Sequence, residues 1–192
     1  MKGRESGMPD ADYWNTFFDA PGILKRLQVA PRGDESVVEF GGGYGTFTLP
    51  LARMTRGRIV ALDIEPELVA SLAHAAHAAG LGNVEVVERD FVSNGTGLPD
   101  GGVDHALLFN ILHIEDPVGL LREAHRLLKP GGTTAVIHWR RDIGTPRGPS
   151  LEIRPSPTQC ADWGRLAGFL PSAGVDLGDA APWHFGLVLS KN

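Results

Sequence analysis

Short apolar segments alternate with longer segments of helical periodicity along most of the chain. The apolar segments have the length of buried strands and lie at 36–40, 58–64, 83–90, 103–109 and 133–139. Strands that alternate with helices in this way pair in parallel, and the helices pack on the faces of the sheet. The pattern therefore predicts an α/β domain with a central, mostly parallel sheet.

Local signals mark the ends of the predicted helices. The segment 66–80 carries apolar residues at helical spacing and finishes on a glycine, which commonly ends a helix. Asp116 is expected to cap another helix, with Pro117 at the first helical position. A third helix is expected over 46–55, although Pro50 falls in its second turn, where a proline removes a backbone hydrogen bond.

The regions outside this alternation are predicted separately. Residues 12–27 have the pattern of one or two short amphipathic helices. Residues 140–157 are rich in Pro and Arg, show no period, and are predicted to form a long loop. A helix over 160–170 and a pair of strands over 174–179 and 183–191 complete the expected elements.

The length and the ends of the chain indicate one domain. With 192 residues the chain fits a single ordinary domain. We predict a flexible tail over 1–12 and one domain over 13–192. No apolar run approaches the roughly 18 residues that span a bilayer, and the polar N-terminus lacks the apolar core of a secretory signal. The single cysteine, Cys160, excludes an internal disulfide, so a cytoplasmic protein is expected.

The net charge limits the classes of partner. It is −5, with the histidines neutral. Binding to nucleic acid depends on neutralising phosphates with a basic surface, so we expect no nucleic-acid partner. No membrane partner is expected either, and the sequence leaves the oligomeric state open.

A glycine-rich segment directly follows the first predicted strand. Four of the eleven residues from Val37 to Phe47 are glycine. In an open α/β sheet, a ligand binds beyond the carboxyl ends of the strands, where glycines let the backbone approach it closely. A dinucleotide fingerprint would need a third glycine at position 46, where Thr46 stands. The loop is therefore expected to hold a nucleotide-like cofactor other than a dinucleotide.

The chain instead reads Glu39-x-Gly41-x-Gly43-x-Gly45, which resembles the class I S-adenosylmethionine-dependent methyltransferases. The resemblance extends to Asp63 at the end of the second strand, Asp90-Phe91 after the third, and the later segment "LLKPGG". It implies a Rossmann-like, doubly wound sheet of seven strands, the last antiparallel, with helices on both faces in a three-layer sandwich. It also implies S-adenosyl-L-methionine as the cofactor.

The resemblance implies a role for each matching residue. Glu39 and the three glycines would lie at the methionine end, where a carboxylate suits the ammonium group. Asp63, with its neighbour Ile64, would bind the ribose hydroxyls. Asp90 and Phe91 would contact the adenine, and Asn110 would line the methionine end.

The small size suggests the branch that resembles the ubiquinone/menaquinone-biosynthesis and other small-molecule methyltransferases. The predicted reaction is in-line transfer of a methyl group to a small acceptor. Arginines in the predicted loop 140–157 suggest that this acceptor is anionic. A catalytically silent S-adenosylmethionine-binding module stays open as an alternative, and an NAD(P)-dependent oxidoreductase is a weaker one.

The residues that follow the fourth and fifth predicted strands are candidates for contacting the methyl acceptor. His113 is a candidate general base, and Trp139 could wall the acceptor pocket or simply be core. Arg140 and Arg154 are candidates for binding an anionic group, although solvated arginines are common in loops. These two belong to the predicted loop 140–157, which we interpret as a substrate loop.

The aromatic residues before the first strand have two readings. Tyr13 and Trp14 lie in a segment, 13–30, that could pack into the core or close over the site as a helical lid that excludes water. No metal site is expected, because His74 and His77 have no further ligand cluster near them in the sequence.

Overall fold

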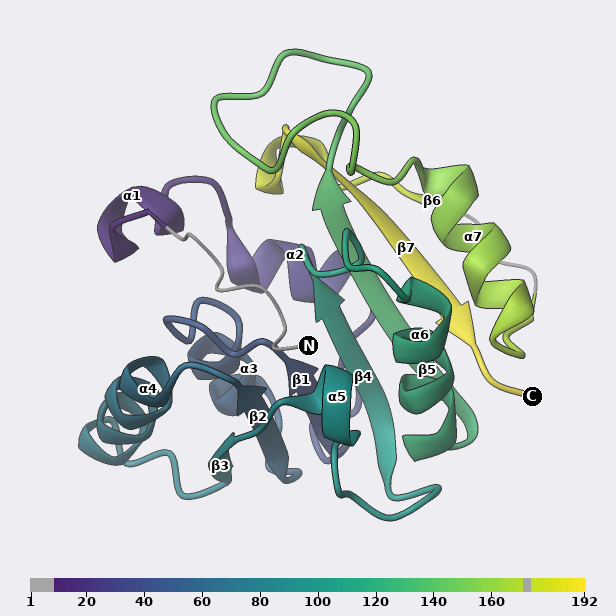
Figure 1. The fold of residues 1–192 in the computed structure, drawn as a ribbon. Coiled ribbons are helices and arrows are strands. Elements are labelled where there is room, and N and C mark those ends of the chain that lie inside the picture. Colours follow the sequence, from purple (N-terminus) through teal and green to yellow (C-terminus); the bar gives the residue numbers. More distant parts are fainter. Residues whose placement is uncertain (1–8, 171–173) are drawn as a thin grey trace.

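The computed structural model describes residues 9–170 and 174–192, and its centre is a seven-stranded sheet in the order β3-β2-β1-β4-β5-β7-β6. The strands are β1 Val37–Phe40, β2 Ile59–Asp63, β3 Val84–Glu88, β4 Val103–Phe109, β5 Leu128–Trp139, β6 Gly174–Val175 and β7 His184–Ser190. The first five pair in parallel, and β7 is antiparallel to β5 and β6. The predicted fold class is confirmed (Figure 1).

Seven α-helices and one short 3-10 helix accompany the sheet in the described part of the chain. They are α1 Ala11–Asn15, α2 Ala20–Arg26, α3 Thr48–Met54, α4 Pro66–Ala78, α5 Phe91–Asn94, α6 Pro117–Leu127, α7 Pro157–Leu166 and η1 Gly178–Ala180. Figure 1 shows α6 and α7 on one side of the sheet, with α2 and α3 on the other.

The central strands β1 and β2 bury all of their residues, and the sheet has one core on each side. Val38 and Phe40 of β1 belong to a core shared with α6 and α7, whereas Val37 belongs to a core shared with α2 and α3. Successive strand residues point to opposite faces. This explains why the central predicted strands are mostly apolar rather than strictly alternating.

The start of one predicted helix differs from the prediction for a physical reason, and the predicted cap of another is confirmed. Helix α3 begins at Thr48, two residues later than expected, so Pro50 is its third residue, where the missing backbone N–H has no partner to lose. Helix α6 has the predicted Asp116 cap, which accepts from Gly119 N–H at 2.8 Å. It ends at Leu127, because Leu128 already pairs with β4.

The N-terminal segment divides into two parts. Helix α2 is core, since Ile23 and Leu24 are fully buried, so it cannot belong to the lid predicted over 13–30. Helix α1 lies nearer the surface and buries none of its residues fully. Of the tail predicted over 1–12, residues 1–8 lie outside the described residues, and Ala11 and Asp12 are part of α1.

The long segment between β5 and α7 has no helix or strand, as predicted. Arg154 organises it from within: the side chain is only 7% exposed. Its guanidinium donates to the carbonyl oxygens of Pro149, Arg140 and Arg147 at 2.7, 2.8 and 3.1 Å, and to the hydroxyl of Thr145 at 2.7 Å. The loop is therefore a hydrogen-bonded unit centred on one buried cation.

Across residues 9–170 and 174–192, none of the helices combines the length and the apolar character that spanning a bilayer requires.

Candidate functional site

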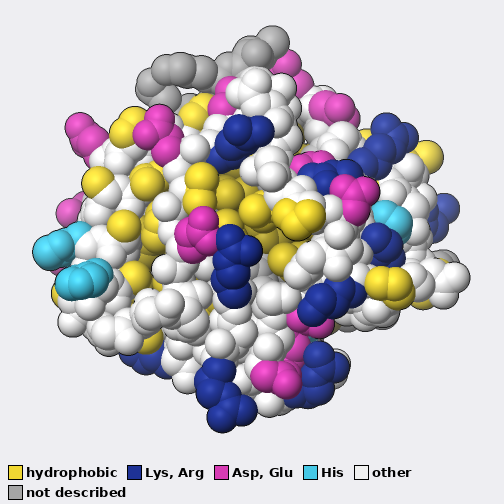
Figure 2. Space-filling model, turned by 90° about the horizontal axis from the view of Figure 1, so that it is seen from below, with side chains coloured by type: hydrophobic (Ala, Val, Ile, Leu, Met, Phe, Trp, Pro, Cys, Tyr) yellow, Lys and Arg dark blue, Asp and Glu magenta, His cyan; other side chains and the backbone are white. Residues whose placement is uncertain are grey.

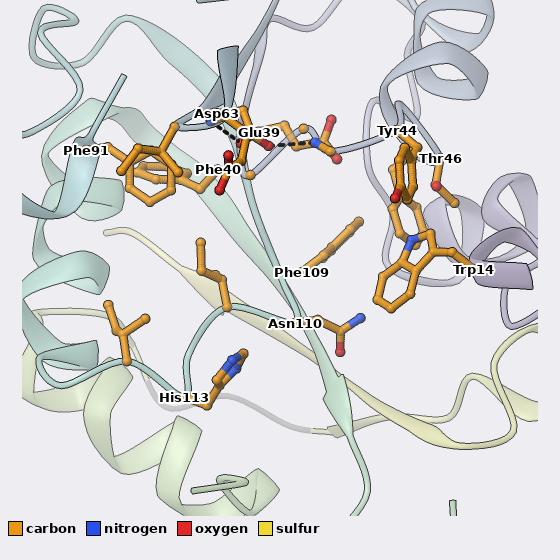
Figure 3. A pocket seen from close by; sticks show the side chains of 18 of the residues that line it. Trp14, Glu39, Phe40, Tyr44, Thr46, Asp63, Phe91, Phe109, Asn110 and His113 are labelled. Carbon is orange, nitrogen blue, oxygen red and sulfur yellow. Dashed lines mark hydrogen bonds between the residues drawn. The ribbon is translucent and has the colours of Figure 1, made fainter. Parts of the chain in front are cut away.

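A cavity of about 500 Å³ lies at the carboxyl ends of the central strands. Its wall includes the loop after β1, the end of β2, the start of α5, the loop after β4, the end of β5 and part of α1. Figure 3 shows Glu39 and Asp63 on one side of the cavity, with Asn110 and His113 across from them. The site thus lies where an open parallel sheet is expected to bind its ligand.

The glycine loop needs its glycines for two different reasons. Gly41, Gly43 and Gly45 have φ values of 80°, 52° and 78°, which other residues rarely adopt. Gly41 and Gly43 line the cavity, but Gly45 does not. A Cβ on Gly45 would lie 2.4 Å from a methyl group of Leu72, so this glycine permits α4 to pack against the loop.

Asp63 joins the loop to the end of β2. Its Oδ2 accepts from Gly43 N–H at 2.8 Å and its Oδ1 accepts from Glu65 N–H at 3.0 Å. The carboxylate lines the cavity, and each oxygen has further lone pairs beyond these bonds. The arrangement can therefore hold the loop in place and accept two ligand hydroxyls at the same time.

Glu39 is a buried acid at the base of the same loop. Its side chain is 1% exposed and accepts a short hydrogen bond from the hydroxyl of Thr48. Burial raises the pKa of Glu39 to about 8, and the nearby charge of Asp63 acts in the same direction, while the Thr48 bond opposes it. A cationic ligand group at this position would favour the ionised form.

The side of the cavity near α5 combines an acid with an aromatic wall. Asp90 caps α5 by accepting from Ser93 N–H at 3.0 Å, and this bond lowers the pKa of Asp90. Phe91 is 8% exposed and packs edge-on against Phe40, with ring centroids 5.2 Å apart. Ile64 lines the cavity nearby. A planar ligand ring with a donor group fits this combination.

Asn110 has a buried amide that faces the cavity. Its backbone has φ of +56°, and both polar atoms of its side chain are buried without a hydrogen-bond partner in the described part of the protein. An unpaired buried amide is costly, so a polar ligand group that bonded to it would remove an energetic penalty.

Two further predicted residues line the same cavity. His113 lines the cavity, and its Nδ1 is 3.2 Å from Nε2 of His138. Trp139 is 2% exposed and also lines the cavity, so it is both core and wall. Trp14 of α1 packs on Trp139 with ring centroids 6.3 Å apart. This part of the cavity lining therefore combines two tryptophan rings with a histidine.

Three predicted acceptor residues are not among those that line the cavity. Tyr13 is 46% exposed and packs edge-on against Phe17. Arg140 forms an exposed ion pair with Asp142, with nitrogen and oxygen 2.6 Å apart. Arg154 bonds to the loop, as described above. Each side chain is directed to a protein partner, which the loop sequence alone does not reveal.

The structure adds residues that the sequence reasoning did not select. Arg147, Gly148 and Pro149 of the loop line the cavity, as do Thr46 and Phe109. Phe109 ends β4, so its position at the carboxyl end of a predicted parallel strand was a usable signal. The position of Arg147 depends on how Arg154 folds the loop, and no local pattern indicates it.

In the described residues, no group of three or more His, Cys, Asp or Glu side chains is placed to hold a metal ion.

Cys160 lies inside α7 and is fully buried. Burial raises the pKa of its thiol to about 12, opposite to the effect expected of a reactive thiol at a helix start.

Comparison with known sequences adds a family and a relative. Residues 37–132, half of the 192-residue chain, match the family described as "Methyltransferase domain". Over 119 residues the chain is 29% identical to the ubiquinone/menaquinone biosynthesis C-methyltransferase UbiE of Enterobacter sp. (strain 638). This match covers 60% of the chain and 47% of the relative, so the chain spans about half the length of that protein.

Comparison with solved structures gives likenesses over nearly the whole chain. An S-adenosylmethionine-dependent methyltransferase from Aquifex aeolicus superposes with a TM-score of 0.81 at 25% identity, covering 95% of this chain and 94% of the other. The 1,6-didemethyltoxoflavin N1-methyltransferase of Burkholderia thailandensis shares the fold at 20% identity, with a TM-score of 0.68 over 94% of this chain and 81% of that one.

Proposed function

The chain belongs to the class I S-adenosylmethionine-dependent methyltransferase domain family, and on this premise we propose that it transfers the methyl group of S-adenosylmethionine to a small organic acceptor. The observation that carries the proposal is the Asp63 carboxylate, which holds Gly43 while it lines the cavity. One side chain thereby couples the shape of the glycine loop to the ligand.

We assign the cofactor end to the residues around this carboxylate. Asp63, beside Ile64, accepts the ribose hydroxyls, while Asp90 and Phe91 face the adenine. Gly41, Gly43 and Glu39 surround the methionine end, together with the buried amide of Asn110. Gly45 acts indirectly, by allowing the loop to pack on α4. These assignments are supported by the positions of the side chains around the cavity.

The remaining work of the protein is alignment. Bound S-adenosylmethionine supplies an electrophilic methyl group, so the chain must hold the acceptor atom in line with it and keep water out. We assign the acceptor wall to Trp14, Trp139 and Arg147, with helix α1 as the lid and residues 140–157 as the substrate loop. In this proposal Arg140, Arg154 and Tyr13 support the wall rather than contact the acceptor.

An anionic acceptor is supported by the charge near this wall. Arg154 is a buried cation whose hydrogen-bond partners in the described structure are neutral oxygens, and Arg147 lines the cavity itself. A carboxylate or phosphate on the acceptor would be attracted to this region. The small cavity volume supports a small acceptor, as does the Burkholderia protein, whose structure holds bound 1,6-didemethyltoxoflavin.

A nucleic-acid acceptor is disfavoured by charge. The chain carries a net charge of −5. In the face shown in Figure 2, Lys and Arg side chains are interspersed with Asp and Glu, and hydrophobic side chains gather near the middle. Phosphate backbones are bound by concentrated basic surfaces instead. The cytoplasmic location stays a prediction from the sequence.

Calorimetric titration tests the cofactor assignment. We expect S-adenosylmethionine and S-adenosylhomocysteine to bind, NAD and NADP not to bind, and Asp63→Ala to weaken binding by at least tenfold, because it removes both the hydroxyl acceptor and the loop contact. Glu67→Gln, on the exposed face of α4, is the matched control and should bind as the wild type does.

Three results would change the proposal. Binding of NAD in place of the adenosyl compounds would replace the methyltransferase with an oxidoreductase. Equal affinity in Asp63→Ala would remove the central assignment. Normal binding without transfer of labelled methyl groups to any member of a metabolite extract would leave a silent binding module.

A further inference from the structure

Gly148 lies where the loop between β5 and α7 meets the cavity. Arg147, Gly148 and Pro149 all line the cavity, as does Trp139 at the end of β5. Figure 1 shows the loop extending beyond the carboxyl end of β5. The loop therefore reaches the cavity through three consecutive residues, and the middle one has no side chain.

The contact between Gly148 and Trp139 requires a glycine. The backbone of Gly148 has φ of +120°, which residues with a side chain rarely adopt. A Cβ at this position would lie 2.9 Å from Cγ and 3.0 Å from Cδ2 of Trp139, and 2.8 Å from Nη2 of Arg154. The loop can approach the indole ring this closely only because position 148 carries no side chain.

Both neighbours of Gly148 are fixed by other contacts. Trp139 is 2% exposed, and the rings of His184 and Phe17 pack against it with centroids 4.1 and 5.3 Å away. The guanidinium of Arg154 is held by the four hydrogen bonds described above. A side chain at position 148 would therefore displace the loop rather than the indole ring or the guanidinium.

The place of the loop limits the room for an acceptor. Pockets for a single drug-sized ligand measure about 300–1,000 Å³. This cavity measures about 500 Å³ and has to take both S-adenosylmethionine and the acceptor. The residues assigned to the cofactor lie on other elements, so the remaining space is bounded by Trp14, Trp139 and the loop. Any shift of the loop away from Trp139 would enlarge this space.

We propose that Gly148 determines the size of the acceptor: it seats the loop on Trp139, and residues 147 and 149 then close the cavity around a compact molecule. The inference rests on the proposed methyltransferase function and deepens it by naming a substrate class, acceptors small enough to fit beneath the seated loop. Gly148 is a positioning residue, since it acts through the place of its neighbours rather than through a side chain of its own.

The seat of the loop can be measured without any acceptor. Gly148→Ala is the test, and Gly144→Ala is the matched control, because a Cβ on Gly144 would meet nothing within 4 Å in the same loop. Indole N–H signals in ¹H–¹⁵N spectra report on the tryptophans, and Trp139→Phe identifies the signal of Trp139. With a neutral nitroxide in the solvent, we expect this signal to be lost in Gly148→Ala and retained in the wild type and in Gly144→Ala.

Two spectra would overturn the proposal. A Trp139 signal that is retained in Gly148→Ala would mean that the loop stays seated despite the added side chain. A signal that the nitroxide already removes in the wild type would mean that the loop does not cover the ring, and this measurement needs no variant that folds.

Transfer assays separate an effect on the acceptor from an effect on the cofactor. Each protein receives labelled S-adenosylmethionine and a metabolite extract, and the labelled products are resolved by mass. In Gly148→Ala, labelling of the wild-type products should slow by at least about tenfold, because a misplacement of about 1 Å can cost about 100-fold in rate. Larger compounds should be labelled in addition, while the KM for S-adenosylmethionine and the affinity for S-adenosylhomocysteine stay as in the wild type.

The outcomes distinguish this inference from the proposed function. An unchanged set of products in Gly148→Ala contradicts the inference and leaves the methyltransferase proposal intact. Weaker binding of S-adenosylhomocysteine in Gly148→Ala also contradicts it, because the defect would then be general. A wild type that binds the cofactor and labels nothing contradicts the proposed function, on which the size limit rests, even where the spectra show the loop seated on Trp139.

Discussion

At the scale of single residues, the cavity is lined by two acids whose pKa values are shifted in opposite directions. The pKa of Asp90 is lowered by a backbone hydrogen bond, whereas burial raises that of Glu39 to about 8. Near neutral pH, Asp90 is therefore an acceptor with a fixed charge, while Glu39 holds a proton that a cationic ligand can displace. The two acids are thus suited to different parts of one ligand.

The raised pKa of Glu39 predicts a pH dependence of stability. The pKa rises from 4.5 to about 8 on folding, so the folded protein binds a proton that the unfolded chain releases. The stabilising contribution of this group is complete below about pH 4.5 and is lost as the pH rises through 8. We expect the free energy of unfolding of wild type, relative to Glu39→Gln, to fall by a few kcal/mol, at about 1.4 kcal/mol per pH unit at most, between pH 5 and 9.

Urea denaturation of both proteins at pH 5, 7 and 9 measures this difference, with Glu67→Gln as an exposed control. A constant difference across this range would mean that Glu39 is ionised in the folded protein.

The same linkage predicts that S-adenosylmethionine binding at pH 7 releases a proton from Glu39, which calorimetry in buffers of different ionisation enthalpy detects.

At the scale of elements, the substrate loop depends on one buried side chain. Arg154→Leu removes four hydrogen bonds and leaves the backbone carbonyls of Pro149 and Arg140 without the donor that Arg154 provides, while the carbonyl of Arg147 still accepts from the hydroxyl of Thr145. We expect a loss of about 2 kcal/mol or more in the free energy of unfolding, and faster tryptic cleavage after Arg141 and Arg147.

Arg140→Leu is the matched control in the same loop. Its ion pair with Asp142 is solvent-exposed, so the loss should be below about 0.5 kcal/mol. Equal effects of the two substitutions, in either stability or cleavage, would show that the buried arginine does not organise the loop.

The sheet was predictable because its signals are local. The central strands are short, largely apolar segments, and Asp116 with Pro117 marks the start of α6 through the chemistry of a single turn. The bounds of α3 were harder, since Pro50 is tolerated anywhere in the first turn of the helix and does not fix its first residue. The cofactor side shares this locality: each assigned residue lies at or near the carboxyl end of a strand, so the fold fixes its place.

The acceptor side was less predictable because its contacts are distant in sequence. Arg154 and Arg147 look alike in the loop, and only the folded loop makes one structural and the other a wall of the cavity. The contact between His113 and His138 joins residues 25 positions apart on different elements. Helix α2 reads as an amphipathic lid, yet it is core because a second apolar face of the sheet needs covering.

At the scale of the whole molecule, the N-terminal segment is tied to the cofactor loop. The hydroxyl of Tyr44 donates to the carbonyl oxygen of Pro9 at 2.8 Å, and that of Thr46 donates to the side chain of Asn15 at 2.7 Å. These contacts connect a helix before the sheet to the turn that follows β1. The binding of a cofactor on one element should therefore be felt on the other.

Hydrogen exchange tests this connection. We expect S-adenosylhomocysteine to slow amide exchange by at least tenfold in residues 41–47 and also in 9–16, with no change in 187–190, the end of β7 that pairs with the part of β5 remote from the cavity. Thr46→Val removes one tie and should reduce the protection of 9–16 alone. Protection restricted to 41–47 in the wild type would mean that α1 closes independently of the cofactor.

The loop closed by Arg154 has a consequence for how such proteins diversify. Its shape is determined by bonds within residues 140–154, while the cofactor residues lie on other elements. A different loop with its own internal hydrogen bonds could therefore replace this segment between β5 and α7 without changing the conformation of the glycine turn. New acceptors can then arise by exchange of one peptide segment, with the methyl-donor half of the molecule inherited unchanged.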